Sequence, residues 1–214
     1  MSVVAPATAG TTGRLARLRV IGALLALYLG SYLLVTRFSA SLPAAAVRDF
    51  ALPIDARIPY VAWTWPFYWL AYPFVVLGGG GVLLALPRHA FRPAAMTVAA
   101  LTLVGMLVQL ALPSRAPWPD DPVAAQQLMH GAGLMLPFAA FPSMHVAYCA
   151  LVSGFSRLTP GGRVRSGAGW LVTALVAVAT LTQKEHYVLD ALAGLALAGT
   201  ALAWWRRQVV SAWA

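Results

Sequence analysis

Two histidines with polar neighbours are the residues of this sequence best suited to chemistry. His145 ends the string Phe-Pro-Ser-Met-His, and His186 precedes Asp190 by four positions. Residues four apart share one face of a helix, so the Asp190 carboxylate can hold one imidazole N–H of His186 and leave its other nitrogen basic. A histidine oriented in this way is a nucleophile toward phosphorus. The alternative is that His186 and Asp190 only satisfy each other at a helix end.

The string before His145 predicts an anion site at a helix N-terminus. Pro142 suits the first helical turn, after which Ser143 and Met144 would offer free backbone N–H groups, and Ser143 a hydroxyl. His145 would then protonate a departing alkoxide as a general acid. A lone Ser-x-His is usually structural, so the catalytic interpretation depends on the second histidine lying on the same membrane face.

The composition predicts an integral membrane protein. Of the 214 residues, 60% are hydrophobic and 10% are charged, with a mean hydropathy of +0.74, whereas a soluble domain has about 25% charged residues. We predict an all-α bundle of six transmembrane helices in one catalytic domain, residues 14–207, between a disordered N-terminal tail, 1–13, and a C-terminal tail, 208–214. The predicted spans are Val20–Thr36, Tyr60–Leu86, Ala94–Leu112, Ser143–Leu158, Ala168–Leu181 and Val188–Trp205.

The charges predict the orientation and the class of partner. The net charge is +9, and the arginines are scattered between apolar segments, which favours anionic lipid headgroups over nucleic acid. Ten lysine and arginine residues fall on the side of the termini and five on the other. Both termini are therefore expected in the cytoplasm, and both histidine strings at the external face. The only cysteine, Cys149, has no partner for an internal disulfide, so the redox compartment is undetermined.

Three motifs make the sequence resemble a known family. Pro142-Ser143-Met144-His145 matches the Pro-Ser-x-His motif of the type-2 phosphatidic acid phosphatase superfamily, and His186-Tyr187-x-x-Asp190 matches its His-x-x-x-Asp pair. Residues 113–118, Pro-Ser-Arg-Ala-Pro-Trp, resemble the Pro-x-x-x-Pro-Trp loop of the inositolphosphotransferase-like branch. The resemblance covers roughly residues 113–194.

The resemblance implies a role for each matching residue. His186 would attack phosphorus and carry a phosphohistidine, while Asp190 would orient it. His145 would protonate the leaving group, and Ser143 would help to bind phosphate oxygens. The family needs no metal ion, and no metal or cofactor is expected here. Asp120-Asp121 is interpreted as part of a solvated loop.

The sequence departs from the pattern of the family in two places. The family's usual Lys-x-x-x-x-x-x-Arg-Pro motif is absent as such, with Arg115 as a partial substitute. Many members have an arginine six positions before the nucleophilic histidine, where this chain has Thr180. Arg115 and Lys184 are the external basic residues closest in sequence to the motifs, so we expect both to bind phosphate instead. The missing arginine weakens binding of a doubly charged phosphomonoester more than that of a singly charged phosphodiester. Further expected contacts to the substrate are His130, Trp118 and Tyr187.

These observations favour a membrane enzyme that cleaves a lipid phosphate or phosphodiester through a phosphohistidine, with a preference for a headgroup phosphotransferase. A purely hydrolytic lipid phosphate phosphatase shares the first step and stays open. A non-catalytic scaffold or transporter subunit is a third alternative, which only Thr180 favours. The lipid, the acceptor and the oligomeric state are not determined.

Overall fold

The computed structural model describes residues 8–133 and 136–211, and all the regular secondary structure in these ranges is helical, as predicted. The longer helices are α1 (Thr8–Ser41), α5 (Arg88–Ala111), α6 (Ala124–Gly131), α7 (Met144–Phe155), α8 (Gly162–Thr182) and α9 (Val188–Ser211). Four short helices follow one another between α1 and α5: α2 (Trp65–Trp69), α3 (Ala71–Pro73), the π-helical η4 (Phe74–Gly78) and α4 (Gly79–Ala85). Single 3-10 turns are η1 (Ala44–Ala46), η2 (Asp55–Arg57), η3 (Ala62–Thr64) and η5 (Ser156–Leu158).

Five helical stretches within these ranges are long and apolar enough to cross a membrane. They are Gly13–Ser41, Ala62–Ala85, Arg88–Ala111, Gly162–Thr182 and Val188–Val209. Each overlaps a predicted span. The predicted span at residues 143–158 differs, because α7 has only 12 residues and its extension η5 adds three, fewer than the roughly 17 that a crossing needs. The predicted count of six is therefore not confirmed.

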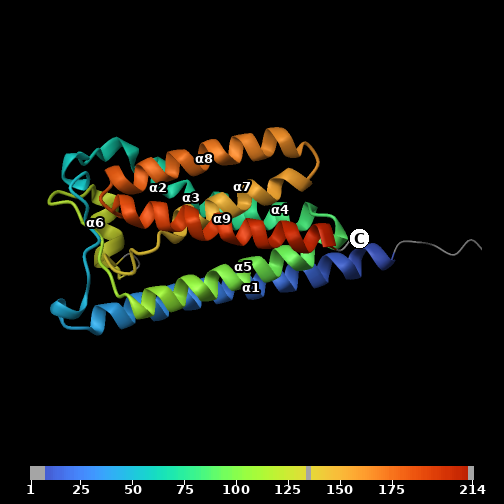
Figure 1. Ribbon diagram of the computed structural model, residues 1–214, viewed down its shortest axis with the longest axis horizontal. Helices are drawn as coiled ribbons and strands as arrows, with labels where there is room; N and C mark the ends of the chain where they lie inside the picture. Colours follow the sequence, from blue (N-terminus) through green and yellow to red (C-terminus); the bar gives the residue numbers. More distant parts are fainter. Residues whose placement is uncertain (1–7, 134–135, 212–214) are drawn as a thin grey trace, which may run out of the picture.

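The short helix α7 is nevertheless the centre of the bundle. Ten of its 12 residues are buried, and it packs against both α8 and α9. α1 and α5 lie side by side along the other edge of the bundle (Figure 1). A helix surrounded in this way needs no lipid-facing stripe, and its sequence is apolar on nearly all sides.

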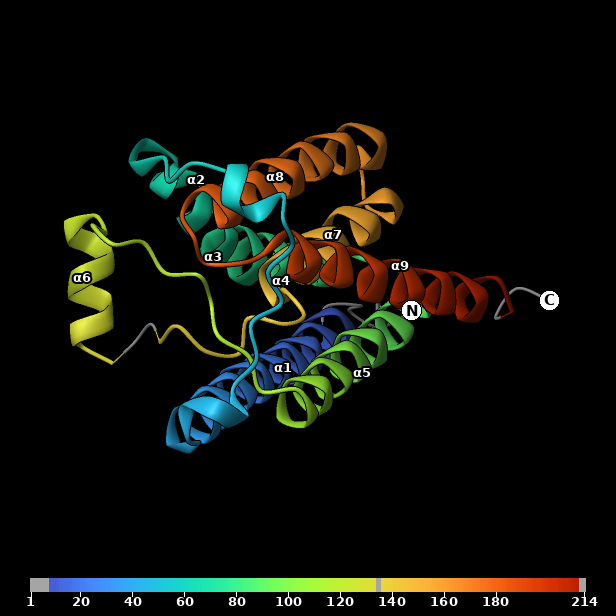
Figure 2. The same ribbon diagram turned by 60° about the vertical axis from the view of Figure 1, so that its left-hand side comes forward.

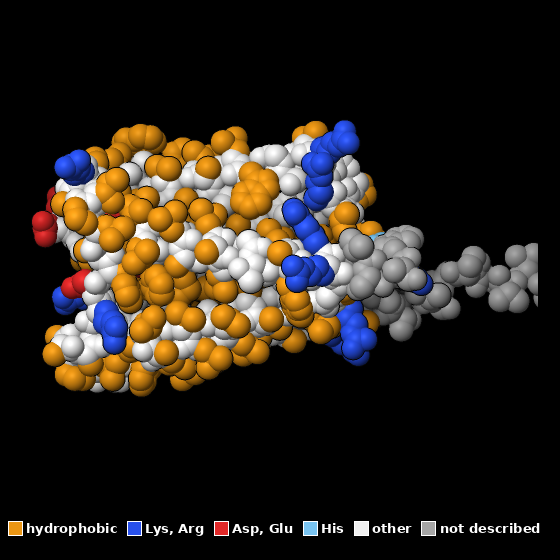
Figure 3. Space-filling view, in the orientation of Figure 1, with side chains coloured by type: hydrophobic (Ala, Val, Ile, Leu, Met, Phe, Trp, Pro, Cys, Tyr) orange, Lys and Arg blue, Asp and Glu red, His pale blue; other side chains and the backbone are white. Residues whose placement is uncertain are grey.

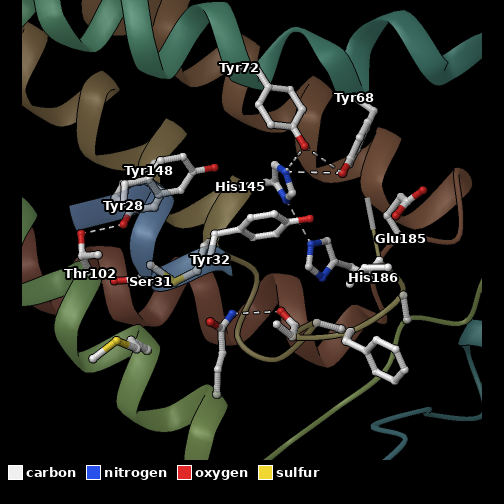
Figure 4. A pocket seen from close by; sticks show the side chains of 18 residues that line it. Tyr28, Ser31, Tyr32, Tyr68, Tyr72, Thr102, His145, Tyr148, Glu185 and His186 are labelled. Carbon is white, nitrogen blue, oxygen red and sulfur yellow. Dashed lines mark hydrogen bonds between the residues drawn. The ribbon is translucent and has the colours of Figure 1, made fainter. Parts of the chain in front are cut away.

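Prolines explain why the second span is irregular. Pro73 has no N–H to donate to the carbonyl of Trp69, so α2 ends there and α3 begins after Leu70. The π-helical turn η4 follows directly, and such turns often occur at functional sites. Tyr68 and Tyr72, on either side of the break, both point toward the interior of the bundle (Figure 4).

The two ends of the bundle differ in charge and in structure. α1 begins and α9 ends at one end, and the long connections, residues 42–61, 112–123 and 136–143, lie at the other (Figure 1). Figure 2 shows α6 beside these connections, apart from the bundle. On the face drawn in Figure 3, lysines and arginines form a band near the termini, and acidic side chains are seen only at the opposite end.

The two predicted tails lie partly outside the described residues. α1 already includes residues 8–13, and residues 1–7 are not described. α9 continues to Ser211, and residues 212–214 are not described.

Candidate active site

His186 lies in the turn between α8 and α9, two residues before α9 begins, so its predicted helical geometry was wrong. The carbonyl of Thr180 accepts the N–H of His186 at 3.1 Å and closes this turn. Asp190 is the third residue of α9, and its Oδ2 accepts the N–H of Tyr187 at 2.8 Å. This is the contact by which an acidic side chain caps the start of its own helix. The same contact fixes the carboxylate beside the turn.

The carboxylate of Asp190 still lies behind His186. His186 Nδ1 and Asp190 Oδ2 are 3.5 Å apart, and the two side chains are 6% and 0% exposed. Within the described part of the chain, His186 Nδ1 and Asp190 Oδ1 have no hydrogen-bond partner. Buried polar atoms are costly when unpaired, so a small turn of the imidazole toward the carboxylate would be favourable. Nδ1 is thus the nitrogen directed to the acid, and Nε2 is directed away from it.

The start of α7 is attached directly to α9. Ser143 caps α7, because its Oγ accepts the N–H of Val146 at 3.5 Å. The backbone N–H of Ser143 was expected to be free for an anion, but it donates to the carbonyl of Asp190 at 2.9 Å. A Cβ at Gly194, one turn further along α9, would collide with the Ser143 carbonyl oxygen. The missing side chain therefore lets the two segments approach.

This attachment brings the two histidines together. His145 Nδ1 lies 3.3 Å from His186 Nε2. On its other side, His145 Nε2 lies 3.2 Å from the hydroxyl of Tyr72 and 3.4 Å from that of Tyr68. Figure 4 shows the two rings facing each other, with these hydroxyls above His145. A chain of polar groups therefore runs from the buried carboxylate of Asp190, through both imidazoles, to the two tyrosines.

The two histidines open into a cavity of about 70 Å³, which we call the histidine cavity. Among the described residues, no lysine or arginine lines it. Its polar groups come instead from the histidines, Glu185, Gln109, hydroxyl side chains and five tyrosines, Tyr28, Tyr32, Tyr68, Tyr72 and Tyr148. An anion in this cavity would be met by neutral hydrogen-bond donors and by the imidazoles.

The two predicted phosphate-binding cations lie outside the histidine cavity. Arg115 forms two hydrogen bonds with Asp49, at 2.7 and 2.6 Å, on the exposed surface, and its guanidinium holds the pKa of Asp49 below its usual value. Lys184 Nζ donates to the carbonyl of Ile58 at 2.5 Å. Thr180 is fully buried, and its hydroxyl donates to a carbonyl of its own helix. Phosphate binding by Arg115 and Lys184 stays a prediction.

The predicted substrate contacts are divided between two places. Trp118, Tyr187 and Arg115 line a separate hollow next to Asp49 on the outer side of the turn. His130 is exposed on α6, with its ring centroid 4.9 Å from that of Trp118. Neither His130 nor Trp118 lines the histidine cavity, whereas Tyr187 lines this hollow and a further one that it shares with His186 and Lys184. Their contact with substrate is likewise untested.

Several residues of the site were not anticipated from the sequence. Tyr68 and Tyr72 were not among the expected site residues, although two hydroxyls four residues apart in an apolar span are a sign of a shared polar partner. Glu185, next to His186, is 7% exposed, and its Oε1 accepts from Gln126 Nε2 at 2.7 Å. Burial raises the pKa of Glu185 to about 8. No local signal links Gln126 to Glu185.

One protein family matches this chain. A family model described as the PAP2 superfamily matches residues 56–204, more than half of the sequence. No curated protein and no solved structure matches it. The matched range contains His145, His186 and Asp190 together with the tyrosines of the second span. The chain therefore belongs to the PAP2 superfamily, the type-2 phosphatidic acid phosphatases, whose activity is of the phosphatase type on phosphate esters.

Proposed function

We propose that the protein is a membrane enzyme that cleaves a lipid phosphate ester through a phosphohistidine on His186. One observation carries this proposal: His145 Nδ1 and His186 Nε2 are 3.3 Å apart, while the Asp190 carboxylate lies 3.5 Å behind His186. Two imidazoles in contact, one of them backed by a buried acid, supply a nucleophile and a general acid at the same point.

The geometry supports one step for each nitrogen. His186 attacks phosphorus through Nε2, because Nδ1 is directed to Asp190. The phosphoryl group occupies the place where the two rings now touch. As the bond from phosphorus to the leaving oxygen breaks, His145 gives that oxygen a proton through Nδ1. In the second step His145 takes a proton from the acceptor hydroxyl, which attacks the phosphohistidine and releases His186.

The lining of the histidine cavity supports a singly charged substrate. Neutral tyrosine and amide donors stabilise an anion less than arginine or lysine does, and no such cation lines this cavity among the described residues. A phosphodiester carries one negative charge and a phosphomonoester up to two. We therefore favour a phosphodiester donor and an alcohol acceptor, a reaction that transfers the headgroup. Hydrolysis by water is the alternative.

Replacing His186 by Ala tests the nucleophile. We expect His186→Ala to lower turnover of a labelled phospholipid by several orders of magnitude, because no covalent intermediate can form. His89→Ala is the matched control, since His89 lies at the start of α5, at the other end of the bundle from the histidine cavity. The unchanged protein should also retain labelled phosphate in a form that is stable to alkali and lost in acid, as phosphohistidine is. Equal turnover by His186→Ala and the unchanged protein would exclude the mechanism.

The acceptor is tested by supplying it. Purified protein in lipid nanodiscs is incubated with a phospholipid labelled in its phosphate, with and without a polyol. Transfer predicts a labelled phosphodiester of the polyol, either water-soluble with the old headgroup or lipid-linked, that forms only when the polyol is present. Release of free phosphate or free headgroup phosphate alone, at a rate that the polyol does not change, would establish the hydrolase instead.

A further inference from the structure

A second cavity of about 130 Å³ lies between α1 and the irregular second span, with α7 beneath it. Apart from two tyrosines its lining is apolar, with Ile21 and Leu24 of α1 on one wall and Gly79 and Gly80 on the other. A Cβ at Gly80 would come within 3.8 Å of Ile21 Cγ2. The two glycines therefore leave open a space that side chains would fill. We call this space the apolar groove.

The apolar groove adjoins the histidine cavity and shares a wall with it. Tyr28 and Tyr148 line both, and their rings pack edge to face with centroids 5.1 Å apart. Tyr148 also shares a hydrogen bond of 2.6 Å with Thr102. The junction is thus polar at the ring hydroxyls and apolar at the ring faces, which suits the point where a headgroup ends and a hydrocarbon chain begins.

The direction of the apolar groove is that of a lipid chain. From Tyr28 to Ile21 the groove follows α1 for about 10 Å, at 1.5 Å per residue. This path leads away from the end of the bundle that holds the histidines (Figure 1). A lipid in one leaflet has the same order, with its phosphate near the surface and its chain toward the midplane.

We propose that the apolar groove holds one hydrocarbon chain of the lipid whose phosphate ester reacts in the histidine cavity. The inference rests on the proposed function, because it takes the reacting ester to be that of a lipid. Bilayer lipid is itself apolar, so the groove gains little from hiding the chain from water. Its effect is one of shape and position: a chain held there places the ester beside His186.

Filling the apolar groove tests the inference. Gly80→Leu places a side chain in it from the second span, and Leu24→Trp enlarges the opposite wall. We expect both variants to lower kcat/KM for a long-chain lipid phosphate ester about tenfold by overpacking. Turnover of a short-chain, water-soluble ester of the same headgroup should stay within about twofold, because its chain does not reach past Tyr28.

Gly81→Leu is the matched control. Gly81 neighbours Gly80 but is exposed and does not line the apolar groove. A Cβ at Gly81 would meet nothing within 4 Å. Gly81→Leu should leave the turnover of both esters unchanged. Thermal unfolding of all variants shows whether each is folded. Equal loss for long and short esters in Gly80→Leu and Leu24→Trp, or no loss for either, would overturn the inference.

A binding measurement separates this inference from the proposed function. Alkylphosphonates keep a carbon–phosphorus bond that the proposed reaction does not cleave, so a long-chain and a short-chain phosphonate bind without turnover. We expect Gly80→Leu to weaken binding of the long-chain phosphonate about tenfold and to leave the short one unchanged. If no ester is turned over but this difference is seen, the proposed function fails while the chain site stands. If esters are turned over but Gly80→Leu binds both phosphonates as the unchanged protein does, only the chain site fails.

Discussion

The two histidines of the site differ in what surrounds each ring. His186 lies between the buried carboxylate of Asp190 and the other imidazole. His145 has no acid beside it in the described residues, and its Nε2 faces the hydroxyls of Tyr72 and Tyr68 instead. This asymmetry supports the proposed division of roles, because a carboxylate favours the basic nucleophile and neutral hydroxyls orient a ring without adding charge.

Tyr72→Phe tests whether the tyrosines position His145. A hydrogen bond contributes about 0.5–1.5 kcal/mol net, so loss of this hydroxyl should lower kcat about three- to tenfold. KM should not change, because the hydroxyl acts on His145 Nε2 and not on the substrate. Tyr68→Phe should have a smaller effect, since the Tyr68 hydroxyl lies farther from His145 Nε2, at 3.4 Å. A rise in KM with unchanged kcat would show that Tyr72 binds substrate instead.

The turn that carries His186 is held by segments from the outer end of the bundle. The carboxylate of Asp55 accepts the N–H of Val188, the first residue of α9, at 2.8 Å, which satisfies one of the unpaired donors at that helix start. From α6, Gln126 donates to Glu185 at 2.7 Å and to the carbonyl of Gln183 at 3.3 Å. The long connections at this end of the bundle therefore act as a brace for the turn that carries His186.

Glu185 makes this brace sensitive to pH. Burial raises its pKa from 4.5 to about 8, while the hydrogen bond from Gln126 lowers it. Between these two pH values the folded protein binds a proton that the unfolded chain has lost, so stability should fall as the pH rises from 4.5 to about 8. Glu185→Gln removes this contribution. Its free energy of unfolding should match that of the unchanged protein at the acid end and exceed it increasingly up to about pH 8, by at most a few kcal/mol, with a correspondingly higher Tm.

Asp49→Asn is the control for this measurement. Asp49 is exposed at the same end of the bundle, and Arg115 lowers its pKa, so it titrates below the pH window of Glu185. The Tm curve of this variant should run parallel to that of the unchanged protein within the window. A Glu185→Gln curve that is also parallel would show that Glu185 is not buried in a neutral form.

The molecule as a whole separates its termini from its site. The turn between α8 and α9, which carries His186, lies at the end opposite to the start of α1 and the end of α9 (Figure 1). The excess of lysine and arginine near the termini favours a cytoplasmic location for the end with the termini. We therefore propose that the histidine cavity opens toward the external face. This orientation also requires α7, with its 12 residues, to carry the chain from one side to the other.

Cysteine labelling tests both the orientation and the crossing by α7. The only native cysteine, Cys149, is buried, so it should not react. Asp121→Cys lies in the outer connection, and Arg163→Cys lies at the start of α8, where α7 and η5 have ended. A membrane-impermeant maleimide on intact cells should label the first and not the second until the cells are permeabilised. Labelling of both would mean that α7 does not cross, and labelling of Arg163→Cys alone would reverse the orientation.

The membrane class, the positions of five long apolar helices and the family could all be predicted from the sequence. Hydropathy is a local property, and a helix of about 20 apolar residues needs no partner to be recognised in a chain. The motifs at residues 142–145 and 186–190 could likewise be recognised in the sequence, because the residues of each motif are neighbours in the chain. Their family is confirmed by the match over residues 56–204.

The surroundings of the reacting atoms could be known only from the packing. Lys184 and Arg115 are near the motifs in sequence, but neither lines the histidine cavity. Lys184 donates to a backbone carbonyl and Arg115 pairs with Asp49 instead. The tyrosines that line the histidine cavity come from α1, the second span and α7, and Tyr72 is 73 residues from its partner His145. Such contacts depend on how whole helices pack and where a proline or a glycine breaks the regular pattern, and no local spacing encodes them.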